Sequence, residues 1–173
     1  MPTSFNAAVR EVFHDIGRQS VISNNVERID HIEYFVAKLA KWFDGVKYAE
    51  VVEEEERKNY WCAISGLALY GYKEVTGLTT QKVKLDGIHT MIKKQADYGP
   101  HNILRFGERG VVVRIYDKVA RLKNLTTTGR EPNNESIADT WLDIMNYAVI
   151  AVMLINRVFE LPLDWDEVDK LKA

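Results

Sequence analysis

The sequence predicts an all-α protein, a helical bundle of about five to six helices. Through most of the 173 residues, apolar side chains recur at intervals of three and four, which is the spacing of one helix face. Gly, Pro and Asp residues separate these stretches at places where a helix would stop. One run, residues 111–115, resembles a strand in composition, but charged residues recur at helical spacing from within this run onward, at Arg114, Asp117, Lys118 and Arg121. We therefore expect a helix there too.

In the first half of the chain, helices are expected at residues 4–19, 26–43 and 47–73. Gly17 and the pair Asp44–Gly45 would end the first two. Gly71 and Gly77 are expected to loosen the end of the third. Four consecutive glutamates at 53–56 would point in four directions, so most of them should face solvent. One side of this helix carries candidate additional metal ligands: Glu50, Glu53 and Glu54.

In the second half, helices are expected at residues 82–96, 110–125 and 134–159. A Gly-rich connector at 97–109 and a polar loop at 126–133 would separate them, and Asn134 would cap the last helix. A short tail with one more helical turn follows. The expected organisation is an N-terminal helical portion at 1–75, a core at 80–160 and a tail at 161–173, together forming one compact domain.

The expected helix at 134–159 is acidic on one side of its first half. Three carboxylates and one amide fall within a sector of about 80°: Glu135, Asp139, Asp143 and Asn146. The second half, Tyr147 to Ile155, is apolar all round, which is typical of a helix in a core. Stacked acids repel one another unless a positive charge lies between them, and Mg²⁺ prefers carboxylate oxygens. A solvated acidic face near a helix N-terminus is the alternative.

The preceding helix is basic on one side, with the pattern Arg114-x-x-Asp117-Lys118-x-x-Arg121. Arg and Lys at this spacing would bind phosphate oxygens, and Asp117 would join the acids of the next helix around Mg²⁺. Two such helices side by side would suit a metal-bound triphosphate. The alternative is a helix surface covered with ion pairs.

Three ordered motifs lie between residues 94 and 147. They are Lys94-x-x-Asp97-Tyr98-Gly99-x-x-Asn102, then Arg114-x-x-Asp117-Lys118-x-x-Arg121, then Glu-Pro-Asn-Asn-Glu-Ser-Ile at 131–137 with Asp139, Asp143 and Tyr147. This set resembles the nucleotide modification associated domain family, type one, found in many bacteriophages. The resemblance covers roughly residues 80–158.

The acidic helix is more distantly similar to the all-α nucleoside triphosphate pyrophosphohydrolases of the MazG and dimeric dUTPase group. That resemblance implies a MazG-like core, oligomeric assembly, and Mg²⁺-dependent cleavage between the α- and β-phosphates. The chain departs from the pattern of this group at Arg57, which stands where a further glutamate would follow Glu53 and Glu54.

The resulting hypothesis is a Mg²⁺-dependent nucleoside triphosphate (deoxynucleotide) pyrophosphohydrolase that releases a monophosphate and pyrophosphate. The candidate catalytic residues are Asp117 and Glu135. The candidate metal ligands are Asp117, Glu135, Asp139 and Asp143. The candidate phosphate-binding residues are Lys94, Arg114, Lys118 and Arg121. The candidate base- and sugar-binding residues are Asp97, Tyr98, Asn102, Asn146 and Tyr147, with a tyrosine ring stacking on the base.

Two other functions stay open at this point. One is a nucleotide-binding or nucleotide-sequestering protein without turnover, linked to phage nucleotide metabolism or modification. The other is a structural helical module whose charged faces are solvated or form subunit contacts. Nucleotide and Mg²⁺ should raise the thermal stability of a hydrolase or of a nucleotide-binding protein, and they should leave that of a structural module unchanged.

Composition narrows the partners. A net charge of −2 argues against a nucleic-acid surface that covers the whole protein, and the single cysteine, Cys62, excludes an intramolecular disulfide. The longest apolar run, Tyr147 to Ile155, is too short to cross a bilayer, and no secretory signal is visible. We expect a cytoplasmic protein (in the host cytoplasm if it is viral) without nucleic-acid or membrane partners. The resemblance implies a homo-oligomer.

Overall fold

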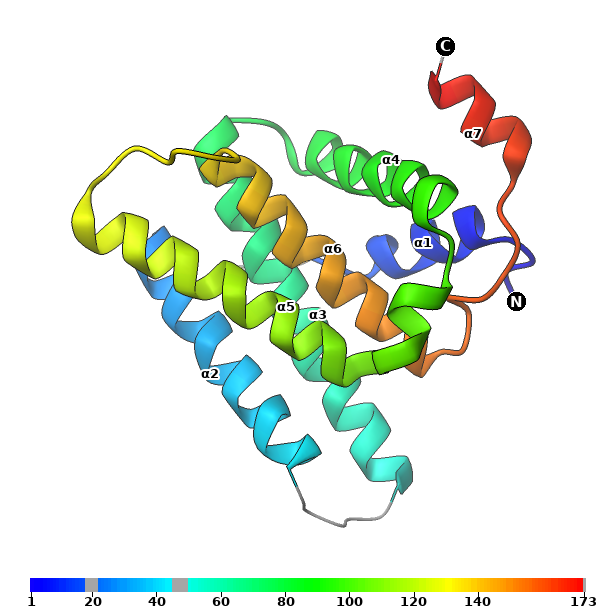
Figure 1. Cartoon of the computed structure of the whole chain (residues 1–173), viewed down its shortest axis with the longest axis horizontal. Coiled ribbons are helices and arrows are strands. Elements are labelled where there is room, and N and C mark those ends of the chain that lie inside the picture. Colours follow the sequence, from blue (N-terminus) through cyan, green and yellow to red (C-terminus); the bar gives the residue numbers. More distant parts are fainter. Residues whose placement is uncertain (18–21, 45–49, 173) are drawn as a thin grey trace.

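The computed structural model describes residues 1–17, 22–44 and 50–172, apart from the side chains of residues 50–52. Within these ranges the chain forms seven α-helices and no strand, so the predicted all-α class is confirmed, whereas the predicted count of five to six helices is too low. The helices are α1 (Phe5–His14), α2 (Asn25–Phe43), α3 (Glu50–Thr76), α4 (Thr80–Tyr98), α5 (His101–Thr128), α6 (Ile137–Ile155) and α7 (Trp165–Lys172) (Figure 1).

Helix α6 lies at the centre of the bundle. It packs mainly against α3 and α5, and it also contacts α1 and α4 (Figure 1). Trp141, Ile144 and Met145 on α6 are each at most 1% exposed. Helix α6 is long and apolar enough to span a membrane, but the core helix of a globular protein meets the same criterion. In α6, 61% of the most apolar 18-residue stretch is buried inside the bundle.

Gly71 makes room for the packing of α3 on α6. A Cβ atom at this position would lie 2.3 Å from Cε3 of Trp141, so only glycine accommodates the indole ring. Helix α3 nevertheless continues through Gly71 to Thr76, and the expectation that this glycine loosens the helix is wrong. Burial against Trp141 outweighs the small entropic cost of a glycine inside a helix.

Two predicted boundaries are also wrong. Ser136, not Asn134, caps α6, because its Oγ accepts a hydrogen bond from the backbone N–H of Asp139 at 3.1 Å. Glu135 therefore precedes the helix. The expected connector at 97–109 is largely helical, because α5 begins at His101. Within α5, Gly107 has φ 57° and ψ −146°, which divides the helix into a short and a long stretch.

We expect Gly107→Ala to lower the free energy of unfolding by about 1–2 kcal/mol, because L side chains rarely adopt this backbone conformation. No neighbouring part of the chain lies within 4 Å of a Cβ at Gly107, so the loss would be one of backbone strain. Urea denaturation at pH 7 measures it. Gly66→Ala in α3 is the control, since a Cβ there makes only ordinary contacts at 3.7 Å or more. Equal losses in both variants would contradict the prediction.

The two terminal helices lie on the same side of the bundle (Figure 1). The backbone N–H of Phe5 donates to the carbonyl of Pro162 at 2.8 Å, and Nδ2 of Asn6 donates to Oε2 of Glu167 at 2.8 Å. Arg10 forms an ion pair with the same glutamate. These contacts hold α1 against the first turn of α7 and the segment before it, and they place Phe5 at the wall of the pocket described below.

Candidate functional site

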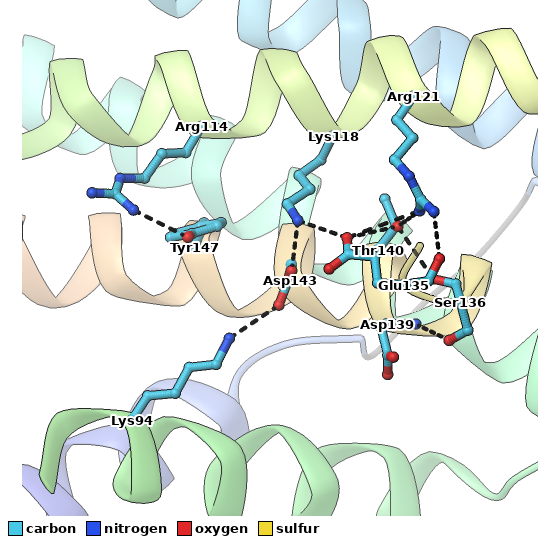
Figure 2. Close-up of polar contacts among 10 residues, drawn as sticks. All are labelled: Lys94, Arg114, Lys118, Arg121, Glu135, Ser136, Asp139, Thr140, Asp143 and Tyr147. Atoms are coloured by element: carbon cyan, nitrogen blue, oxygen red, sulfur yellow. Dashed lines mark hydrogen bonds and ion pairs between the residues drawn. The ribbon is translucent and has the colours of Figure 1, made fainter. Parts of the chain in front are cut away.

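A row of cations on α5 faces the acidic end of α6. Arg114, Lys118 and Arg121, which we call the cation row, all extend from α5 toward α6 (Figure 2). They share one side of the helix because they are four and three residues apart. The facing of a basic and an acidic helix, which the sequence pattern predicts, is thus present in the structure.

Lys118 lies between two of the predicted metal ligands. Its Nζ is 2.7 Å from Oε1 of Glu135 and 2.8 Å from Oδ2 of Asp143 (Figure 2). The Lys118 side chain is only 23% exposed, and that of Asp143 is 15% exposed. The repulsion expected between the acids is therefore relieved by an ammonium group.

The ion pairs shift the titration of both partners. The hydrogen bond from Lys118 is the main reason that the pKa of Glu135 is lower than usual, and burial opposes this only in part. Burial by itself lowers the pKa of Lys118, but the hydrogen bonds to Asp143 and Glu135 outweigh it, so the pKa of Lys118 is raised. Both groups therefore remain charged across the neutral pH range.

The other two cations near this end of α6 are also engaged. Arg121 donates to Oγ1 of Thr140 and to the backbone carbonyl of Glu135. Lys94, at the end of α4, has its Nζ 3.3 Å from Oδ1 of Asp143, and its side chain is 56% exposed. Asp143 thus bridges α4 and α5 through two lysines.

Arg114 differs from the rest of the cation row. Its Nη1 donates to the hydroxyl of Tyr147 at 3.3 Å, and its guanidinium lies 5.6 Å from the centre of the Tyr147 ring. Among the residues that the structure describes, no carboxylate pairs with Arg114. Figure 2 shows its guanidinium turned away from Lys118, toward the C-terminal half of α6.

A pocket of about 370 Å³ opens beside Arg114, between α4, α5 and α6. Its walls are partly apolar, with Met91, Ile150 and Phe159, and partly polar, with Gln95. Seven of the residues predicted from the sequence to bind a nucleotide or metal line it: Lys94, Tyr98, Asn102, Arg114, Asp143, Asn146 and Tyr147.

The segment that builds this site also matches a known family. Residues 94–155 match the family model of nucleotide modification associated domain 1. The match runs from Lys94 to the last residue of α6, so it includes the cation row and the acidic end of α6. Comparison with curated proteins and with solved structures found no match. The resemblance stated from the three motifs is confirmed for this segment, and the similarity to MazG-type enzymes stays a hypothesis.

Several of the ligands predicted from the sequence lie outside the pocket and away from the cation row. Asp117 is exposed on another side of α5, where it lines a separate groove with Phe43 and Arg109. Asp139 is exposed, and its carboxylate points away from the cation row (Figure 2). Asp97 is exposed near the end of α4 and does not line the pocket. The two candidate catalytic residues, Asp117 and Glu135, are therefore not neighbours on one face.

The additional ligands considered on α3 are also separate. Glu54 lies 3.9 Å from Arg157, which follows the C-terminal end of α6, whereas the acids lie at its N-terminal end. Glu53 is buried on the same helix. The side chain of Glu50 lies outside the described residues.

The residues that the structure describes do not form a ready-made Mg²⁺ site. Across residues 1–17, 22–44 and 53–172, no group of three or more His, Cys, Asp or Glu side chains is arranged to hold a metal ion. Mg²⁺ requires several oxygen ligands in octahedral geometry. Here Glu135 and Asp143 share the ammonium of Lys118 instead, and a metal could bind both only after this lysine had moved.

Some residues of the site carry no signal in the sequence. Phe5 lines the pocket although it lies far from residues 94–147 along the chain, and Phe159, expected as the last residue of the helix at 134–159, lines it from beyond the end of α6. Gln95 is different, because its spacing from Met91 and Tyr98 places all three on one face of α4, and this pattern could have identified it. Thr140 contacts both Arg121 and Glu135, and only the fold reveals this.

We expect the stability of the protein to fall as the pH drops from about 5 toward 3, in part because of Glu135. A carboxylate with a lowered pKa in the folded state contributes stability above its unfolded pKa, and this is lost as the pH falls through the folded pKa. Glu135→Gln should lose less stability over this range, measured by urea denaturation at several pH values. Glu131→Gln, in the exposed loop before α6, should behave like the unmodified protein. Parallel curves for all three proteins would contradict the prediction.

Proposed function

We propose that the groove between α4, α5 and α6, which comprises the pocket and the adjoining ion pairs of Lys118 and Arg121, binds a nucleotide, with the base and sugar in the pocket and a phosphate group on Arg114. The observation that carries the proposal is the position of Arg114 at the pocket without a carboxylate partner among the described residues. An arginine in such a position offers a planar set of donors that matches phosphate oxygens.

The composition of the pocket supports this ligand class. Its volume of about 370 Å³ lies within the usual range for small-molecule sites, about 300–1,000 Å³. Tyr98 is 72% exposed and Tyr147 is partly exposed, so both rings have surface available for stacking on a base. Gln95 and Asn102 add side-chain amides that can donate and accept hydrogen bonds. The family match over residues 94–155, with its link to nucleotides, agrees with this ligand.

Mg²⁺-dependent hydrolysis of a nucleoside triphosphate to a monophosphate and pyrophosphate is the second candidate. It is favoured by the two carboxylates that border the groove, Glu135 and Asp143 (Figure 2). It would require Lys118 to leave Glu135 and Asp143 before these acids could act as metal ligands. For this reason we rank binding without turnover first.

A thermal-shift screen of the purified protein with ribo- and deoxynucleotides, with and without Mg²⁺, tests both candidates, provided that each mixture is then analysed by chromatography. We expect a shift that does not need Mg²⁺ and a nucleotide that remains intact. A ligand at one hundred times its Kd should add about 2.7 kcal/mol of stability. Monophosphate that appears only with Mg²⁺ would favour hydrolysis, and no shift with any nucleotide would contradict the proposal.

Arg114→Gln supplies the residue-level test. The variant should bind the nucleotide found in the screen about tenfold more weakly or worse, because a charge-assisted hydrogen bond is lost. Arg109→Gln is the matched control, since Arg109 lies on the same helix but lines the separate groove next to α2. Isothermal titration calorimetry measures both affinities. Equal affinities for the two variants would contradict the placement of the phosphate on Arg114.

A further inference from the structure

The charges of the groove indicate how many phosphate groups its ligand carries. Building on the proposed function, we propose that the preferred ligand is a nucleoside monophosphate, with its single phosphate held by Arg114 and Lys94. Longer phosphate chains would meet the carboxylates of Glu135 and Asp143 and are disfavoured.

Two of the four cations are already neutralised. Lys118 lies within 2.8 Å of both Glu135 and Asp143, and Arg121 lies 3.9 Å from Glu135 while it donates to Thr140. Both cationic side chains are only 23% exposed. Ion pairs that are partly buried and have several hydrogen bonds are costly to break, because each separated charge must find a new partner.

The other two cations are available at the pocket. Among the residues that the structure describes, the polar partner of Arg114 is Tyr147, and Lys94 makes a long contact of 3.3 Å with Asp143 from an exposed position. Lys94 is the exposed partner of this pair, and Asp143 keeps its shorter ion pair with Lys118, so Lys94 can turn to a phosphate at low cost. Both residues line the same pocket.

The net charge of the groove matches one phosphate group. Four cations (Lys94, Arg114, Lys118 and Arg121) face two carboxylates (Glu135 and Asp143), which leaves two positive charges. A phosphate monoester carries about −1.5 to −2 charges at pH 7. One such group would balance the groove, whereas a triphosphate would add excess negative charge.

The direction of the cation row adds a geometric reason. Lys118 lies one helical turn, about 6 Å, beyond Arg114. A second and third phosphate that followed the row would lie against Asp143 and Glu135 and would compete for Lys118 and Arg121. Phosphate groups that pointed out of the groove would form no ion pair with Lys118 or Arg121.

Isothermal titration calorimetry without Mg²⁺, at constant ionic strength, tests the inference. The four ligands are a nucleoside and its mono-, di- and triphosphate, all with the same base. The base is the one that gives the largest thermal shift in the screen. We expect the monophosphate to bind about tenfold or more tightly than either the triphosphate or the nucleoside. A triphosphate that binds as tightly as the monophosphate would overturn the inference while nucleotide binding stands. A nucleoside that binds as tightly as the monophosphate would also overturn it, and no binding at all would overturn the proposed function itself.

Two charge-matched variants test the cause. Glu135→Gln removes a carboxylate that borders the groove but does not line the pocket. The ratio of the affinities for monophosphate and triphosphate should therefore decrease several-fold. Glu33→Gln removes one negative charge from the ion pair of Glu33 with Lys123, between α2 and α5, and should leave the preference unchanged. Narrowing to the same extent in both variants would show that overall charge, not the groove carboxylates, sets the preference, and this would overturn the inference.

Discussion

Trp141→Ala is expected to lower the free energy of unfolding by about 3–5 kcal/mol, the largest stability loss that we anticipate for a single side chain. Trp141 is 1% exposed at the contact of α6 with α3, where Gly71 leaves space for the indole. Removing the ring creates a cavity between two long helices that cannot close easily, because both are fixed elsewhere along their length. Urea denaturation followed by far-UV circular dichroism measures the change.

Trp165→Ala is the matched control, since Trp165 is 53% exposed at the start of α7. Its truncation should change the stability only slightly. A small loss for Trp141→Ala, similar to that for Trp165→Ala, would mean that the contact of α3 with α6 is not the centre of the core.

Lys118→Met is expected to lower the free energy of unfolding at pH 7 by about 2–3 kcal/mol, somewhat less than the loss for a fully buried ion pair. The variant would leave Glu135 and Asp143 next to each other without the ammonium that separates them. The deficit should shrink as the pH falls toward about 4, because protonation of Glu135 removes its repulsion with Asp143 in the variant and its ion pair with Lys118 in the unmodified protein. Urea denaturation of the variant and the unmodified protein at pH 7, 5 and 4 measures this difference.

Adding Glu135→Gln to the Lys118→Met variant should restore part of the lost stability, since it removes one of the two charges that repel each other. Lys123→Met is the control for the loss of a lysine on the same helix, because Lys123 pairs with Glu33 in an exposed position. It should leave the stability nearly unchanged. A deficit for Lys118→Met that does not depend on pH would mean that the lysine stabilises the protein through packing of its aliphatic part and not through its charge.

The amino-acid sequence by itself determined the all-α class, the central place of α6 and the common face of the cation row. These features follow from the spacing of side chains within one helix, which is about 100° per residue wherever the helix lies. Lys94, Tyr98 and Asn102, which also line the pocket, were candidates because of the resemblance and not because of helix periodicity, since Gly99 separates α4 from α5.

Only the tertiary structure decided which charges meet. Asp117 is next to Lys118 in the sequence, but a single residue turns the side chain by about 100°, and the orientation of α5 between α2 and α6 places this acid in a different groove. The same orientation puts the Lys118 ammonium between Glu135 and Asp143, where the sequence had suggested a metal ion. Phe5 reaches the pocket because α1 is held by Pro162 and Glu167. Periodicity is a property of one helix, whereas distances between helices depend on how whole faces pack against each other.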